Sequence, residues 1–168
     1  MRVFTGTHSR TSLTAAAATA LLLFAPLEAA ADATIFTGVN TMPSNRAVRG
    51  FGVGISLLVI GFEFEYSSNG EDELEGAPSL RTGMFNVLVQ TPVPLAGLQF
   101  YGTTGAGVYR EELANVLETH MGLNFGGGVK IALAGPLRAR IDYRVFTLQG
   151  SPVESRPQRI YFGLNFAF

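Results

Sequence analysis

Apolar and polar residues alternate with a period of two through the last third of the chain, in three consecutive segments. Within residues 121–131, one face carries Met121, Leu123, Phe125, Val129 and Ile131, and the other carries Gly122, Asn124, Gly126, Gly128 and Lys130. Residues 137–145 and 159–168 repeat this arrangement. Successive side chains of a β-strand point to opposite faces, so the pattern predicts strands that each have one apolar face. A chain patterned in this way is confined to an all-β architecture.

Weaker strands are expected upstream, and the connections between them alternate in length. The strands fall near residues 33–39, 49–57, 60–67, 80–90 and 97–110, which makes about eight in all. Long polar loops are expected at 41–48, 69–78, 111–118 and 149–157, with short links near 57–60, 91–96 and 134–136. This alternation predicts an eight-stranded antiparallel up-and-down barrel, because all hairpins at one end of such a barrel share one environment. The link at 57–60 lacks the Gly, Asn or Pro typical of a tight turn.

The N-terminal segment has the features of a secretory signal peptide. Arg2 and Arg10 precede an apolar stretch over residues 13–24. After this stretch, Ala29-Ala30-Ala31 offers small side chains for cleavage before Asp32. An uncleaved anchor helix is the alternative, but the apolar stretch is shorter than the roughly 20 residues that a spanning helix needs. We therefore expect a signal peptide over residues 1–31 and one barrel domain over residues 32–168.

The two faces of the predicted strands differ in charge, and this difference indicates which face points outward. One face is almost purely aliphatic and aromatic, whereas the other mixes Gly, Asn and single charged residues. A soluble barrel would expose a much denser set of Lys and Glu to water. A narrow lumen favours small residues and paired ions instead. The pattern therefore predicts a transmembrane β-barrel with its apolar face in contact with membrane lipid.

Charged residues on the inward face are expected to form an ion network. Phe62, Phe64 and Tyr66 would face outward, so Glu63 and Glu65 must point inward. With Asp142 as a further acid, these carboxylates are expected to pair with some of the inward cations Lys130, Arg138, Arg140, Arg144 and Arg159. Three acids against five cations leave surplus positive charge. That surplus implies bound anions, water-exposed ends for Arg138 and Arg159, or an anion preference in any pore.

Other kinds of site find little support in the sequence. The chain has no Cys, and its net charge of -1 with scattered Arg residues argues against nucleic-acid binding. His120, the only His after residue 31, has no neighbouring Ser for nucleophilic catalysis, so we expect no enzymatic activity.

Two further motifs have compositions that ligand sites use. The acidic run Glu71-Asp72-Glu73 with Glu75 fits no EF-hand spacing and is expected to be a solvated loop. Gly126-Gly127-Gly128 could suggest a phosphate loop, but it lies within an alternating strand and precedes no helix, so close strand packing explains it better. Neither a metal nor a cofactor is expected.

The C-terminal segments resemble a known family. Gly126–Lys130, Leu137–Arg144 and a final strand ending in Phe168 are similar to the small outer-membrane β-barrel domains of Gram-negative bacteria, the OmpA-like and OmpX-like barrels. The resemblance implies secretion through the periplasm and location in the cell outer membrane. It also implies recognition by the barrel assembly machinery through the alternate terminal residues Phe162, Leu164, Phe166 and Phe168.

The sequence is compatible with two classes of function. One is a structural or interaction role, in which a rigid monomeric barrel with a largely plugged polar lumen presents external loops. The other is a narrow pore or a conduit for a small solute. Eight strands enclose room only for side chains or one small ligand, which favours the first class. The inward glycines Gly50, Gly52 and Gly54 leave a partly hollow lumen, and with it the second class, open.

Overall fold

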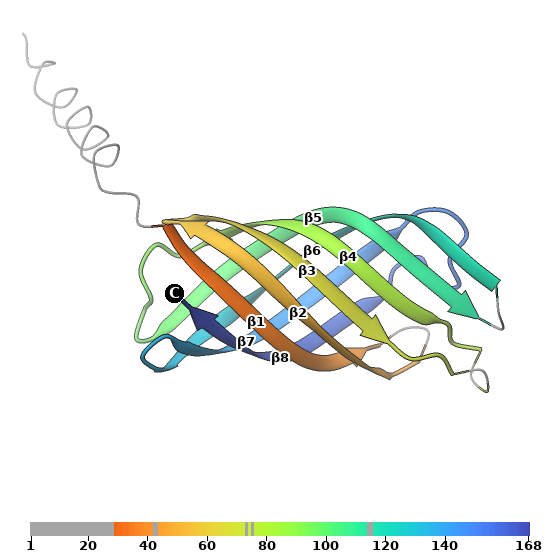
Figure 1. Cartoon of the computed structure of the whole chain (residues 1–168), viewed down its shortest axis with the longest axis horizontal. Coiled ribbons are helices and arrows are strands. Elements are labelled where there is room, and N and C mark those ends of the chain that lie inside the picture. The colour runs from red at the N-terminus through yellow and green to blue at the C-terminus, as the bar shows by residue number, and fades with distance from the viewer. Residues whose placement is uncertain (1–28, 42–43, 73, 75, 114–115) are drawn as a thin grey trace, which may run out of the picture.

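The computed structural model is a closed β-barrel in which every strand pairs with its sequence neighbours (Figure 1). It describes residues 29–41, 44–72, 74, 76–113 and 116–168. The strands are β1 (Ala29–Asn40), β2 (Arg46–Leu57), β3 (Ile60–Asn69), β4 (Ser79–Gln90), β5 (Leu98–Leu113), β6 (Val116–Ala134), β7 (Leu137–Leu148) and β8 (Gln158–Ala167). All neighbouring pairs are antiparallel, which confirms the predicted up-and-down barrel of eight strands.

The first and last strands close the barrel. Residues Asp32 to Asn40 of β1 pair with Arg159 to Ala167 of β8, and the backbones of Ala31 and Phe168 exchange hydrogen bonds of 2.9 and 2.8 Å. None of the eight described strands has an unpaired edge, as a barrel in lipid requires. The predicted signal peptide lies outside the described residues up to position 28, whereas residues 29–31 begin β1. Cleavage before Asp32 stays a prediction.

The barrel wall is apolar outside and polar inside. Outward residues such as Ile35 and Phe85 are 66% and 72% exposed, whereas the inward residues Arg140, Asp142 and Arg144 are all 0% exposed. The described part of the chain contains no helix that is long and apolar enough to cross a membrane. The apolar side chains therefore form a lipid-compatible outer wall, and the charged side chains are enclosed.

The short link between β2 and β3 forms a turn without the usual turn residues. Leu58 adopts a left-handed backbone with φ of 53°, which is uncommon for a residue with a side chain. Gln90, at the end of β4, donates from its side chain to the carbonyl oxygen of Leu58 at 3.3 Å and from its backbone to that of Val59 at 2.8 Å. These bonds from a neighbouring strand stabilise the turn that local sequence does not encode.

Two predicted loops are shorter than expected. The segment 111–118 was expected to be a loop, but β5 extends to Leu113 and β6 starts at Val116, with Glu111 paired to Glu118. Polar residues occupy both faces of this hairpin, with Glu111 inward and Arg110 and Glu112 outward, so the alternation of apolar and polar residues fades although the strands stay paired. The loop expected at 41–48 likewise ends before Arg46, the first residue of β2. The Arg46 guanidinium donates to the carbonyl oxygens of Gly70 and Pro78.

Candidate functional site

The most distinctive feature of the molecule is its filled lumen. Inward positions recur at every second residue, so β3 contributes Glu63 and Glu65, and β7 contributes Arg140, Asp142 and Arg144. These two strands lie on opposite sides of the ring, four strands apart. Side chains from opposite walls can meet because an eight-stranded barrel is narrow. Together with Arg159 of β8, these residues form what we call the ionic layer.

Arg144 lies at the centre of the ionic layer. Its Nη2 atom lies 3.1 Å from an oxygen of Glu63 and 3.1 Å from an oxygen of Glu65, and its Nε donates to Asp142 at 2.9 Å. Arg140 pairs with both oxygens of Glu63 and approaches Asp142 at 3.4 Å. Each buried guanidinium thus faces carboxylates from two strands, which compensates much of its desolvation.

Arg159 extends the layer towards the long loops. It pairs with Glu65 and donates to the Ser67 hydroxyl at 2.9 Å. Its guanidinium carbon also lies 5.1 Å from the ring centre of Phe36 and 5.0 Å from that of Phe146, within the range of cation–π attraction. Arg159 is only 1% exposed, so the water-exposed end considered for it is not observed.

Lys130 and Arg138 lie outside this layer, nearer the end with the short turns. Lys130 pairs with Asp32 at 2.5 Å, and Arg138 donates to the side-chain oxygen of Gln99 at 3.3 Å. Asp32 adds a fourth inward acid that the sequence interpretation omitted, because that residue was assigned to the cleavage site. The expected surplus of two positive charges is therefore too large: among these residues four acids face five cations, and Arg138 carries the difference.

Tyr101 is a second contributor that the sequence analysis missed. Its hydroxyl donates to Asp142 at 2.5 Å and accepts from Nε of Arg140 at 2.7 Å. Its ring occupies the space beside Gly128, where an added Cβ would lie only 2.5 Å from the Tyr101 oxygen. Gly128 is therefore explained by close packing rather than by phosphate binding.

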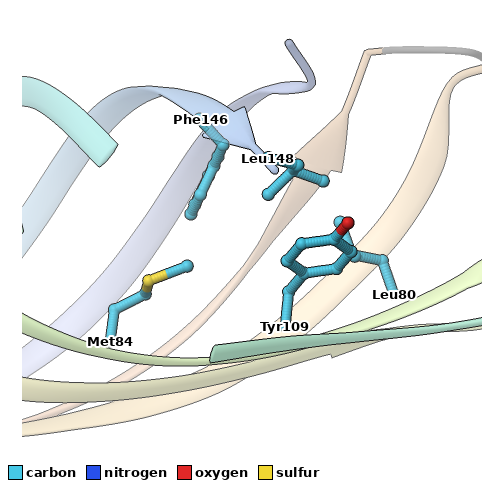
Figure 2. Close-up of a cluster of buried hydrophobic side chains, with 5 residues drawn as sticks. All are labelled: Leu80, Met84, Tyr109, Phe146 and Leu148. Carbon is cyan, nitrogen blue, oxygen red and sulfur yellow. The ribbon is translucent and has the colours of Figure 1, made fainter. Parts of the chain in front are cut away.

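A cluster of apolar side chains fills the lumen on the long-loop side of the ionic layer. Figure 2 shows this apolar cluster, which comprises Leu80, Met84, Tyr109, Phe146 and Leu148. Phe146 and Leu148 continue the inward stripe of β7 beyond Arg144, so the alternation itself could have revealed them. The lumen therefore changes from ionic to apolar along one strand.

The glycine stripe of β2 does not leave the lumen hollow. An added Cβ at Gly50 would collide with the Phe36 ring, and one at Gly52 or Gly54 would lie 3.4 Å from Glu63 or Asp32. Large side chains of neighbouring strands therefore occupy the space that these glycines free. At the short-turn end, the lumen opens into a cup of about 280 Å³ beside Lys130 and Arg138.

The other sequence candidates occupy peripheral positions. His120 is exposed and lies 3.6 Å from Glu118. Glu73 and Glu75 lie outside the described residues, and the part of the chain that is described holds no group of three or more His, Cys, Asp or Glu side chains suited to a metal ion. Of the predicted insertion signal, Phe162, Leu164 and Phe166 lie on the outer wall of β8, and Phe168 is exposed beyond it.

Comparison with known proteins identifies the fold. No family model matches the sequence, and no curated protein matches it. Among solved structures, the N-terminal β-barrel domain of Pseudomonas aeruginosa OprF superposes with a TM-score of 0.64 at 14% identity, covering 83% of this chain and 97% of that one. Neisserial surface protein A gives 0.64 and 14%, covering 83% and 96%. The attachment invasion locus protein Ail of Yersinia pestis gives 0.50 and 11%, covering 83% and 98%.

The chain has the fold of the eight-stranded outer-membrane β-barrels. In an outer-membrane barrel the short turns lie at the periplasmic end and the longer connections at the external end. The apolar cluster lies at the end of the barrel that corresponds to the external end of such barrels. The pair of Lys130 and Asp32, with the cup beside it, lies at the end that corresponds to their periplasmic end.

Proposed function

We propose that this protein is a closed outer-membrane barrel whose role lies in the segments it presents outside the cell, rather than in transport or catalysis. The observation that carries the proposal is the filled lumen, which two successive layers of side chains occupy. Its outer-membrane location is supported by the apolar wall and the barrel fold.

The ionic layer opposes the passage of solutes. Arg144 contacts carboxylates of β3 and β7, so a path through this level requires buried ion pairs across the lumen to separate. Removing one partner of such a pair costs about 3–5 kcal/mol, because a buried charge is left uncompensated. Thermal motion therefore opens this level only rarely.

The apolar cluster forms a second barrier. Met84 is 0% exposed and Phe146 is 3% exposed, and they approach from opposite sides of the lumen (Figure 2). Hydrophobic constrictions block ions because water inside them is unfavourable. An ion that passed the ionic layer would therefore meet an apolar barrier before reaching the exterior.

The external segments are held against the barrel. The carboxylate of Glu111 on the β5–β6 hairpin accepts from the backbone N–H of Val153 at 3.3 Å. The hydroxyl of Tyr109 also donates to the carbonyl oxygen of Gln149. Both contacts tie the connection between β7 and β8 to the hairpin, so these segments form one surface suited to contact a partner. The name of one structural neighbour, the attachment invasion locus protein, is consistent with such a role.

A narrow pore is the second candidate function. The cup of about 280 Å³ at the periplasmic end, with Lys130 and Arg138 in its wall, favours this alternative. If the layers above the cup were displaced, Arg138 would give the pore a preference for anions, since Asp32 balances the charge of Lys130.

Single-channel recording of the purified protein in planar bilayers tests the proposal. We expect no steady conductance from the unmodified protein. The variant Met84→Ala/Leu148→Ala thins the apolar cluster and is also expected to stay closed, because the ionic layer remains. Steady, anion-selective openings of the unmodified protein would favour the pore instead.

A further inference from the structure

In the described strands, the charged residues of the outer wall lie at its external end. On β2, β4 and β5, the large outward apolar side chains end at Phe51, Phe85 and Val108. The next outward residues with a polar side chain are Arg49, Arg81 and Arg110, all of them exposed. The periplasmic half of the outer wall in the described strands has no outward Lys or Arg. This asymmetry suggests a partner at the external membrane interface.

The three arginines belong to one continuous row across the strands. Arg49 pairs in register with Ser68, Ser68 with Arg81, and Arg81 with Arg110. Like charges directly opposite each other destabilise a sheet. Among the described residues, no carboxylate lies within ion-pair distance of Arg81 or Arg110. The Nε atom of Arg110 donates to the hydroxyl of Thr119 at 3.4 Å. An anion between Arg81 and Arg110 would relieve their repulsion.

A groove in the outer wall leads from these two arginines into the apolar region. It measures about 320 Å³ and is lined by Tyr66, Gly83 and Val108 as well as by Arg81 and Arg110. An added Cβ at Gly83 would meet only Phe64 and Val108, both at 4.0 Å, so this glycine leaves a shallow trough between larger side chains. A trough in an apolar wall with two guanidinium groups at one end matches an amphiphile with an anionic head.

We propose that this groove binds a phosphorylated lipid of the outer leaflet. A phosphate would lie between Arg81 and Arg110, since guanidinium groups donate paired hydrogen bonds to phosphate oxygens. An acyl chain would lie in the trough over Gly83. A second groove of about 700 Å³ joins Arg81 to Arg49 and offers room for another anionic group, although Glu71 and Glu112 also line it. Because the three arginines lie at the external end of the barrel, the bound lipid would come from the external leaflet.

Native mass spectrometry of the folded protein in a non-ionic detergent, with diphosphorylated lipid A as the probe, tests this proposal. We expect Arg81→Gln and Arg110→Gln each to weaken lipid binding about tenfold or more, because each removes a charged hydrogen-bond donor. Lipid A without its phosphates should bind less tightly to the unmodified protein. Arg156→Gln, which changes an exposed arginine of the β7–β8 connection, is the matched control and should leave binding unchanged.

A second variant separates the acyl chain from the phosphate. Gly83→Leu fills the trough but keeps all three arginines, and the open space at this position lets the barrel fold, which circular dichroism would verify. We expect it to weaken binding as well. The proposal is overturned if the two arginine variants bind like the unmodified protein, or if lipid A without phosphate binds equally well. Displacement of the lipid by an equal concentration of inorganic phosphate would also overturn it, since a free anion would then be the ligand.

Discussion

At the scale of single residues, Glu63 connects the two central arginines of the lumen. It pairs with Arg140 and also accepts from Arg144 at 3.1 Å, and its side chain is almost fully buried. Neutralising it leaves two guanidinium groups with fewer compensating charges. Such a residue should therefore contribute strongly to stability while having no contact with the membrane.

A double-mutant cycle tests this coupling. We expect Glu63→Gln to destabilise the barrel by about 3–5 kcal/mol, because it removes one partner of buried ion pairs. Adding Arg140→Gln should cost less than the sum of the two single changes, as measured by urea unfolding in detergent. Glu63→Gln combined with Thr147→Ala on the outer wall serves as the additive control. Simple additivity of the Glu63 and Arg140 variants would mean that the pair is not coupled.

Glycines of β5 allow a test of packing at single positions. A Cβ added at Gly105 would collide with the carbonyl oxygen of Phe85 and the side chain of Asn86, whereas one at Gly102 would meet only the Gly126 carbonyl oxygen at 3.9 Å. We expect Gly105→Ala to lower the free energy of unfolding by about 1–3 kcal/mol. Gly102→Ala on the same strand should change it by less than about 0.5 kcal/mol. Equal effects of the two changes would show that the inner wall is loosely packed.

The alternation predicts which side of the wall a residue faces but not which residue it contacts. Glu63 and Glu65 could be placed in the lumen because outward aromatic residues flank them. Their partners depend on the stagger between distant strands, which a single sequence does not reveal. Tyr101 was therefore missed although it occupies an inward position, and Asp32 was missed because it lies at the predicted cleavage site, before the expected first strand.

At the scale of elements, β7 shows how strongly depth in the membrane constrains the outer wall. Ile141 and Thr147 both point outward on this strand, but Ile141 lies near its middle and Thr147 near its external end. An outward arginine near mid-membrane cannot reach water, whereas one near the interface can extend its guanidinium to the headgroups.

Substitution of these two residues by arginine should therefore have different costs. We expect Ile141→Arg to destabilise the folded barrel by about 2–4 kcal/mol and Thr147→Arg by about 0–1 kcal/mol. Equilibrium unfolding in lipid vesicles measures both. Similar costs at the two positions would contradict the assigned depth of β7.

The sequence predicts strands best where one face would contact lipid, because the alternation of apolar and polar residues is clearest there. The ranges of β7 and β8 follow directly from the alternation of Leu137–Val145 and of Arg159–Phe168. The sequence predicts a loop at the external ends of β5 and β6 because polar residues occupy both of their faces there and the alternation stops. The β2–β3 turn likewise depends on Gln90, a residue from another strand.

At the scale of the whole molecule, the distribution of side chains is the reverse of that in a water-soluble protein. Its central ion pairs are enclosed, with Arg140 and Arg144 both at 0% exposure, and most of its large apolar side chains point outward. This arrangement is favourable only if lipid surrounds the wall. The proposals of a closed lumen and of a lipid site at the arginine row both depend on this orientation. Each requires its residues to lie on a particular face and at a particular end of the barrel.

Quenching of single tryptophans by lipid tests this orientation most directly. The chain has no Trp, so each Phe→Trp change introduces one reporter. Phe51, Phe62, Phe85, Phe100, Phe125 and Phe162 point outward from six strands, whereas Phe36 and Phe146 point inward from β1 and β7. In vesicles with brominated acyl chains, tryptophan at the six outward positions should be strongly quenched, and tryptophan at the two inward positions should not. Equal quenching at both sets, or quenching of the inward set alone, would contradict the orientation of the wall.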